Sequence, residues 1–302
     1  MMALRTLGLG YLLTFTLSAT AQTGAVNTLA MWSRKPGNFS DIENPDKSNL
    51  KTLDLSKFKL QKRIMRDAQY DRDVTYKGIP LTQVLNSYKP SEHDNMVILH
   101  FDNGMAIPLM LDPSVLSRLD PFLALEICEP KTDCVTSFPS IGKDEVYGLS
   151  DDPRPLTFTW NKVVVSKEWH PAVPASKSGI FSPWRHSDSL AGIEFVNATA
   201  YYRQFEFDKG AGEKVFKARC QFCHSIRNVG AHYGWDYATP LAIYEKRSPE
   251  HLLNHVKYPK VQAKKKGLMM PTQDDVTLGE MQALWQWMKA GAKRKTLPPY
   301  QP

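Results

Sequence analysis

Two cysteines three residues apart, followed at once by a histidine, constrain this chain more than any other feature. The segment from Cys220 to His224 has the sequence Cys-Gln-Phe-Cys-His. At this spacing the two thiols and the imidazole lie within about one helical turn of each other, so they can act together on a single group. The preceding stretch, Gly210 to Arg219, has a helical pattern rather than that of a strand.

Three kinds of chemistry use such a segment. Each thiol can add across a vinyl group of haem, and the histidine then lies under the ring with a nitrogen facing the iron. A redox dithiol usually follows a strand in a βαβ unit. Zinc needs two further ligands, for which His232 is the only close candidate. We therefore predict one haem c, attached through Cys220 and Cys223, with His224 as an axial ligand of the iron.

The N-terminus has the parts of an export signal. A short positive start, Met1 to Arg5, precedes an uncharged and mostly apolar stretch, Thr6 to Ser18, and Ala19-Thr20-Ala21 has the small residues that a signal peptidase recognises. The apolar stretch is too short to span a bilayer, and no later segment is long and apolar enough. We expect residues 1–21 to be a signal peptide and the mature chain to be a soluble periplasmic protein without an integral membrane segment.

The remaining two cysteines, Cys128 and Cys134, are separated by five residues. Export places them in an oxidising compartment, where a spare pair of thiols tends to close. We predict a small disulfide loop, with two free thiols as the alternative.

The pattern along the chain predicts several parts. Residues 22–50 are polar, which indicates an extended N-terminal arm. Residues 51–165 have a mixed pattern: a strand over 73–76, a turn over 77–80, a helix from 81, a hairpin of 96–101 and 105–111 around Asp102-Asn103-Gly104, and a strand over 156–165. Residues 166–207 are aromatic and irregular, and we expect a connector packed across two domains.

From Asp208 the pattern becomes helical. Gly212 and Phe216 lie one turn apart on a helix that leads into residues 220–224, which we call the Cys-His segment. Residues 277–288 have an amphipathic pattern that Thr277 can cap. We expect the small Gly212 to allow these two helices to approach closely, with Phe216 and a Trp filling the crossing. The expected apolar face of the second helix consists of Leu278, Met281, Leu284, Trp285 and Met288.

In these features residues 208–292 resemble a class I cytochrome c domain: a Gly-x-x-x-Phe helix, Cys-x-x-Cys-His, a Gly-containing loop, a Met-Pro segment and a final helix. The resemblance implies an all-α domain over 208–302. It also implies His224 and a distal Met as the axial ligands. Met270, directly before a Pro, matches that Met best, and Met269 is the alternative.

One departure from the family concerns the histidine. The family often has Gly-Pro-Asp-Leu after the haem segment, and the Pro carbonyl accepts the ring N–H of the proximal histidine. This chain has Gly234-Trp235-Asp236-Tyr237 instead. A backbone carbonyl can still serve there, and it would set the orientation of the ring.

Residues 51–165 resemble, more weakly, the molybdopterin-binding domain of sulfite-oxidase-type oxidoreductases. The resemblance rests on Val74 to Leu85, the hairpin around Asp102-Asn103-Gly104 and the strand that ends in Asn161 to Val165. The family binds molybdenum through a Cys upstream of the first of these segments, but Gln61 to Tyr76 contains no Cys. The resemblance therefore implies an α+β domain without a cofactor, serving as a binding or docking module.

The charge is unevenly distributed. Residues 208–302 contain 16 Lys and Arg against 8 Asp and Glu, whereas the rest of the chain contains 22 against 23. No nucleic-acid-binding motif accompanies this excess, so it favours protein partners with acidic surfaces. Lys264, Lys265 and Lys266, shortly before Met270, are candidate docking residues, and a solvated lysine-rich loop is the alternative.

These features together predict an electron carrier rather than an enzyme. If His224 and Met270 both bind the iron, no position remains for a substrate, which suits outer-sphere electron transfer. The alternatives are the haem subunit of a sulfite-oxidase-like oxidoreductase and a haem-based sensor in which Met270 is displaced. His170, His186 and Trp184 are candidate neighbours or alternative ligands of the haem, although hydrogen-bonded structural roles are the simpler interpretation.

Overall fold

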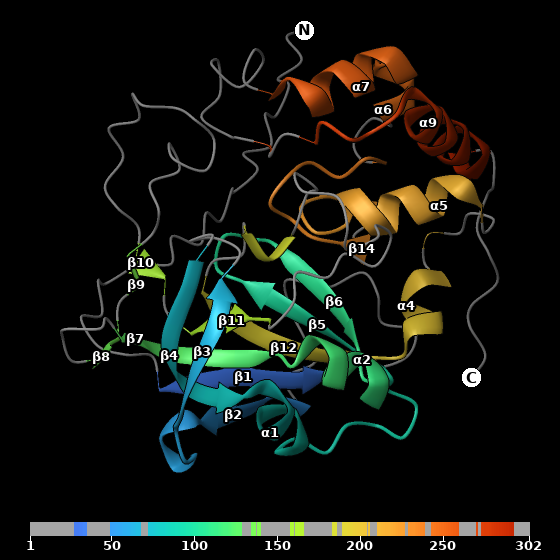
Figure 1. Ribbon diagram of the computed structural model, residues 1–302. Coiled ribbons are helices and arrows are strands. Elements are labelled where there is room, and N and C mark those ends of the chain that lie inside the picture. Colours follow the sequence, from blue (N-terminus) through green and yellow to red (C-terminus); the bar gives the residue numbers. More distant parts are fainter. Residues whose placement is uncertain are drawn as a thin grey trace, which may run out of the picture.

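Two β-sheets and a group of helices form three layers in the computed structural model of this protein (Figure 1). One apolar core contains residues of both sheets, and a second contains residues of the first sheet and of the C-terminal helices. The structure describes residues 27–34, 49–67, 72–128, 134–136, 138–139, 158–159, 161–165, 183–185, 189–203, 205, 210–226, 229–238, 243–259, 270 and 273–292.

The first sheet has five strands in the order β2-β1-β12-β5-β6. β1 runs parallel to β12, and the other neighbours are antiparallel. The hairpin of β5 and β6 confirms the prediction made from its turn, where Gly104 adopts a φ of +84°. The strands are β1 (Thr28–Ser33), β2 (Lys51–Asp54), β5 (Met96–Phe101), β6 (Ala106–Met110) and β12 (Leu190–Val196).

Strands β1 and β12 differ from the organisation expected from the sequence. β12 is the central strand of the first sheet although it lies within 166–207, where we expect an irregular connector, and β1 lies within the expected arm, 22–50. Six of the seven residues of β12 are buried. A strand covered on both faces lacks the alternation of apolar and polar residues that reveals a half-exposed strand.

The second sheet has the order β11-β7-β4-β3, and β8 joins it beside β7. β4 continues through 77–80, where the sequence predicts a turn, and α1 begins at Leu81 as predicted. The strand predicted over 156–165 is divided between β10 and β11. The elements of this part are η2 (Leu55–Lys57), β3 (Gln61–Asp67), β4 (Arg72–Pro80), α1 (Leu81–Asn86), α2 (Pro113–Leu119), β7 (Phe122–Cys128), β8 (Cys134–Val135), β9 (Phe138–Pro139), β10 (Phe158–Thr159), β11 (Lys162–Val164) and η3 (Pro183–Arg185).

A disulfide joins Cys128 to Cys134, the pair that the sequence predicts to close, and their Cα atoms are 4.0 Å apart. The two cysteines are register partners where β7 pairs with β8. The bond therefore fixes the short strand β8 to the edge of the second sheet.

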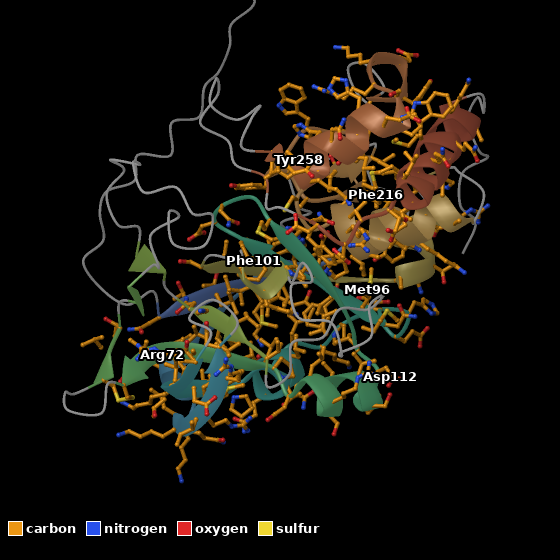
Figure 2. The ribbon with its side chains drawn as sticks, turned by 45° about the horizontal axis from the view of Figure 1, so that its top comes forward. Arg72, Met96, Phe101, Asp112, Phe216 and Tyr258 are labelled. Carbon is orange, nitrogen blue, oxygen red and sulfur yellow. A yellow bond between two sulfur atoms is a disulfide. The ribbon has the colours of Figure 1, made fainter. Side chains whose placement is uncertain are left out.

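Strand β5 contributes to both cores. Val97 and Leu99 belong to the core shared by the two sheets, whereas Met96 and Ile98 belong to the core beneath the helices. Successive side chains of a strand point to opposite faces, so one strand serves both layers. Figure 2 shows Met96 on the sheet and Phe216 in the helical layer.

The C-terminal part is not the all-α domain that the resemblance implies, and that prediction is wrong. Its described residues include a two-stranded sheet, β13 with β14, and short helices separated by irregular segments. Its apolar side chains share a core with the first sheet instead of packing only on one another. Gly230, with a φ of +117°, supports the tight β13–β14 hairpin that the helical pattern hides. The elements are α4 (Ala198–Arg203), α5 (Ala211–Val215), the π-helix η4 (Phe216–Cys220), β13 (Ser225–Ile226), β14 (Val229–Gly230), α6 (Ile243–Lys246), α7 (Pro249–Lys257) and α9 (Leu278–Ala292).

Helices α5 and α9 cross closely, and this confirms the prediction made from Gly212. A Cβ added to Gly212 would lie 2.3 Å from the Cβ of Trp287 and 2.4 Å from the carbonyl oxygen of Ala283. The ring centroids of Phe216 and Trp287 are 6.1 Å apart at this crossing. The crossing fixes the helix that leads into the Cys-His segment.

Thr277 caps α9 as predicted. Its Oγ1 accepts the N–H of Glu280 at 3.2 Å, and the carboxylate of Glu280 accepts the N–H of Thr277 at 2.9 Å. The buried face differs in part from the expected one, because Trp287 is buried whereas Trp285 is half-buried and Leu278 is 37% exposed. The buried residues are Met281, Leu284, Trp287 and Met288.

The predicted signal segment, 1–21, lies outside the described residues. Among the helices of the described ranges, none combines the length and the apolar character needed to cross a bilayer.

Candidate functional site

The Cys-His segment lies at the C-terminal end of the helix formed by α5 and η4. In η4 the N–H of Gln221 donates to the carbonyl of Phe216 at 3.0 Å, which is a π-helical bond. The N–H groups of Cys223 and His224 then donate to the carbonyl of Cys220 at 3.1 and 2.8 Å. Both thiols and the imidazole are thereby held within one turn. Turns of π-helix occur frequently at functional sites.

A backbone carbonyl orients the ring of His224. Nδ1 of His224 donates to the carbonyl oxygen of Trp235 at 2.9 Å. Because a carbonyl only accepts, Nδ1 carries the proton and Nε2 of the neutral ring carries a free lone pair. Nε2 has no hydrogen-bond partner among the described residues. Trp235 lies at the position where class I cytochromes c, which this segment resembles, often have Pro. The backbone carbonyl that accepts the histidine N–H is therefore present although the residue differs.

The partly buried position of His224 favours its neutral form. It lowers the pKa of His224 to about 4, against the hydrogen bond to the Trp235 carbonyl, and a charge on His255 acts in the same direction as burial. A neutral imidazole is the form that binds a metal ion. His255, on α7, is a neighbour that the sequence did not reveal, because it lies far along the chain and belongs to no motif.

Gly234 leaves room for the imidazole. A Cβ added to Gly234 would lie 2.3 Å from Cε1 and 2.5 Å from Nδ1 of His224. The N–H of Gly234 donates to the carbonyl of Cys223 at 2.6 Å. The backbone of the loop therefore lies directly against the ring.

We expect Gly234→Ala to lower the free energy of unfolding by about 1–3 kcal/mol, because the new methyl group overlaps the imidazole of His224. Gly279→Ala is the matched control: its Cβ would meet nothing closer than Oγ1 of Thr277, at 4.0 Å. In helix α9 this change is expected to be neutral or stabilising by up to about 1 kcal/mol. Urea unfolding of both variants measures the difference, and equal stabilities would contradict the close approach at Gly234.

The two thiols belong to different cores. Cys220 lies in the core beneath the helices and Cys223 in the core shared by the sheets, and each residue is 6% exposed. Burial raises the pKa of both thiols to about 12, and Cys220 also hydrogen-bonds the side chain of Tyr237. A dithiol that reacts by exchange has a lowered thiol pKa instead.

The chain after His224 folds back over the segment. The N–H of Ala231 is shared between the carbonyls of Gln221 at 2.9 Å and His224 at 3.1 Å. The N–H of Tyr237 donates to the carbonyl of Ser225 at 2.8 Å, and the Tyr237 ring lies 4.6 Å from that of His224. These bonds hold the loop that carries the Trp235 carbonyl.

The first sheet forms one wall of the site. The N–H of Ala106, at the start of β6, donates to the carbonyl of Phe222 at 3.1 Å, and the N–H of His232 donates to the carbonyl of Gly104 at 3.0 Å. The Phe222 side chain is 2% exposed and packs in the core shared by the sheets. The sequence did not reveal these contacts, because the β5–β6 hairpin lies far from the segment along the chain.

Of the two candidate distal ligands, Met270 alone is described. It is half-buried and packs against the core that contains Cys220. Trp184 is 4% exposed and belongs to the core that contains Cys223. The predicted neighbours and docking residues outside the described ranges are His170, His186, Lys264, Lys265, Lys266 and Met269.

The described residues bring together no group of three or more His, Cys, Asp or Glu side chains able to hold a metal ion among themselves. Comparison of the sequence with models of known protein families and with curated proteins finds no match. The chemistry of the site therefore carries the functional conclusion.

Proposed function

We propose that this protein carries one covalently bound haem c, attached to Cys220 and Cys223, and transfers electrons between redox partners. The observation that supports this most is the 2.9 Å hydrogen bond from Nδ1 of His224 to the carbonyl of Trp235. It fixes the tautomer and the orientation of the ring and leaves Nε2 for the iron. Proteins commonly orient metal-binding histidines in this way.

The residues of the segment fit a haem group. Both cysteines are free and buried among apolar side chains, so their sulfurs can form thioethers in surroundings that suit a porphyrin. Their raised pKa values argue against a dithiol that acts by disulfide exchange. When bound, haem c supplies an Fe(III)/Fe(II) couple.

Each residue then has a separate task. The two sulfurs would hold the group, and Nε2 of His224 would bind the iron. The Trp235 carbonyl keeps the proton on Nδ1 and so preserves the lone pair on Nε2. Met270 is the candidate for the other side, and its thioether would favour the reduced state. If His224 and Met270 both bound the iron, no position would remain for a substrate, and outer-sphere electron transfer would be the chemistry that the group supplies.

We also propose an exported, periplasmic location and partners with acidic surfaces. The disulfide between Cys128 and Cys134 supports an oxidising compartment, as does the signal-like sequence of residues 1–21. The excess of Lys and Arg in residues 208–302 supports acidic partners.

A redox titration tests the proposal. The full chain, produced in a host that matures c-type cytochromes, should bind about one iron per chain and no molybdenum. Its visible spectrum should change reversibly in a single one-electron step, and its reduced form should resist carbon monoxide. Molybdenum in the protein would favour an oxidoreductase, and ready binding of carbon monoxide would favour a sensor. A colourless protein would refute the proposal.

A further inference from the structure

We infer that Arg219 is a positioning residue that fixes the Met270-bearing chain against the Cys-His segment. This inference rests on the proposed function, because it concerns how the second axial ligand of the haem is held. It is carried by a set of contacts that we call the Arg219 network, formed by Arg219, Gln273, Asp275 and Glu280.

Arg219 directly precedes Cys220 and is 7% exposed. Its Nη1 and Nη2 donate to the two carboxylate oxygens of Asp275 at 3.2 and 3.0 Å, and its Nε donates to Glu280 at 2.9 Å. A paired, charge-assisted fork of this kind sets both distance and orientation. One side chain next to the first thiol thus binds two acidic residues that follow Met270.

Gln273 adds a second connection. It is 2% exposed, its side-chain amide donates to the carbonyl of Arg219 at 3.4 Å, and its own N–H donates to the carbonyl of Val256 on α7 at 3.2 Å. Three residues of extended chain span at most about 10 Å. Met270, three positions before Gln273, therefore stays within about 10 Å of Gln273 while these contacts persist.

The Arg219 network is also attached to helix α9 through Glu280. Glu280 lies in the first turn of α9 and is held there by its capping bonds with Thr277. α9 in turn packs closely against α5 at Gly212. The guanidinium of Arg219 thus connects the Met270-bearing chain to both helices that frame the Cys-His segment.

The role of Arg219 as a positioning residue predicts a ligand-exchange effect. In Asp275→Asn the loop loses the charged fork, so imidazole added to the ferric protein should displace Met270 with an affinity raised about tenfold. The near-infrared absorption that requires a thioether–iron bond should weaken, and the reduction potential should fall. Arg219→Lys, which keeps the charge but not the fork, should give a smaller change in the same direction.

Two controls separate positioning from general loosening. Asp274→Asn changes the exposed neighbouring carboxylate and should leave imidazole affinity unchanged. Glu280→Gln weakens the attachment to α9 and should lower thermal stability, with less effect on imidazole affinity than Asp275→Asn.

The outcomes distinguish this inference from the proposed function. A wild-type protein without covalent haem would refute both. A haem protein in which Asp275→Asn and Arg219→Lys bind imidazole as Asp274→Asn does would refute the positioning role alone. Absence of the thioether–iron absorption from the wild-type protein would also refute it, since Met270 would then not bind the iron.

Discussion

We expect the double substitution Cys220→Ser and Cys223→Ser to abolish covalent haem attachment, and the double substitution Cys128→Ser and Cys134→Ser to leave it in place. The two double variants remove the same number of cysteines from the same chain, but only the first pair is free and precedes His224. Thioether formation needs those sulfurs, whereas the disulfide joins β8 to β7 in the second sheet.

Haem staining of the two variants after denaturing electrophoresis, normalised to protein, measures this difference. The variant of Cys128 and Cys134 is expected to lose stability, because a small disulfide loop contributes about 2–4 kcal/mol. The protein that is still produced should nevertheless carry covalent haem and stain. Staining of the Cys220 and Cys223 variant would show that the haem is held elsewhere.

We expect Glu194→Gln to lower the free energy of unfolding by about 3–5 kcal/mol, because it leaves a buried arginine without its counter-charge. The side chains of Arg34 and Glu194 are only 10% and 4% exposed. Nη2 of Arg34 donates to Glu194 at 2.8 Å, Nε of Arg34 contacts the other oxygen, and Nε2 of His100 lies 3.0 Å from the carboxylate. This pair connects the end of β1 to β12 and so secures the N-terminal segment to the first sheet.

Glu126→Gln is the matched control. Glu126 pairs with Lys77 at 2.9 Å, but these side chains are 17% and 35% exposed, so the expected loss is about 1 kcal/mol or less. Urea unfolding of the two variants at neutral pH measures both losses. Equal losses of unfolding free energy in the two variants would contradict the argument that Glu194→Gln leaves a buried, uncompensated charge on Arg34.

The same pair predicts a pH dependence. Burial alone would raise the pKa of Glu194, but the hydrogen bond from His100 and the charge of Arg34 outweigh it and lower this pKa from 4.5 to about 2. The folded-state pKa lies below the unfolded one, so the stabilisation is complete above about pH 4.5 and is lost as the pH falls towards 2. The stability difference between the wild type and Glu194→Gln should therefore shrink over this range.

The local features of this chain could be predicted because they depend on short spacings. The β5–β6 turn and the Thr277 cap each follow from residues within a few positions of one another. The close crossing at Gly212 joins two distant helices, and it was predicted from the small residue on one helix and the amphipathic pattern of the other. β12 could not be found in this way, since its partners β1 and β5 lie far along the chain and both of its faces are covered.

The site was predictable to the same extent. The residues of the Cys-His segment come from local sequence. The resemblance to class I cytochromes c implied a backbone acceptor for the histidine, and the structure identifies the Trp235 carbonyl as the acceptor of its Nδ1–H. The wall formed by Gly104 and Ala106 depends on packing between distant parts of the chain. The prediction of an all-α C-terminal domain was wrong for the same reason. Its helices pack on the first sheet, and this packing between distant parts of the chain cannot be predicted from the sequence of the helices alone.

The most direct test is the intact mass of the mature chain after unfolding in acid and organic solvent, which removes haem that is not covalently bound. We predict a mass that exceeds the polypeptide by one haem, with the added mass located by proteolysis on the peptide containing Cys220 and Cys223. A mass equal to that of the polypeptide alone, from a host that matures other c-type cytochromes, would contradict the proposed function.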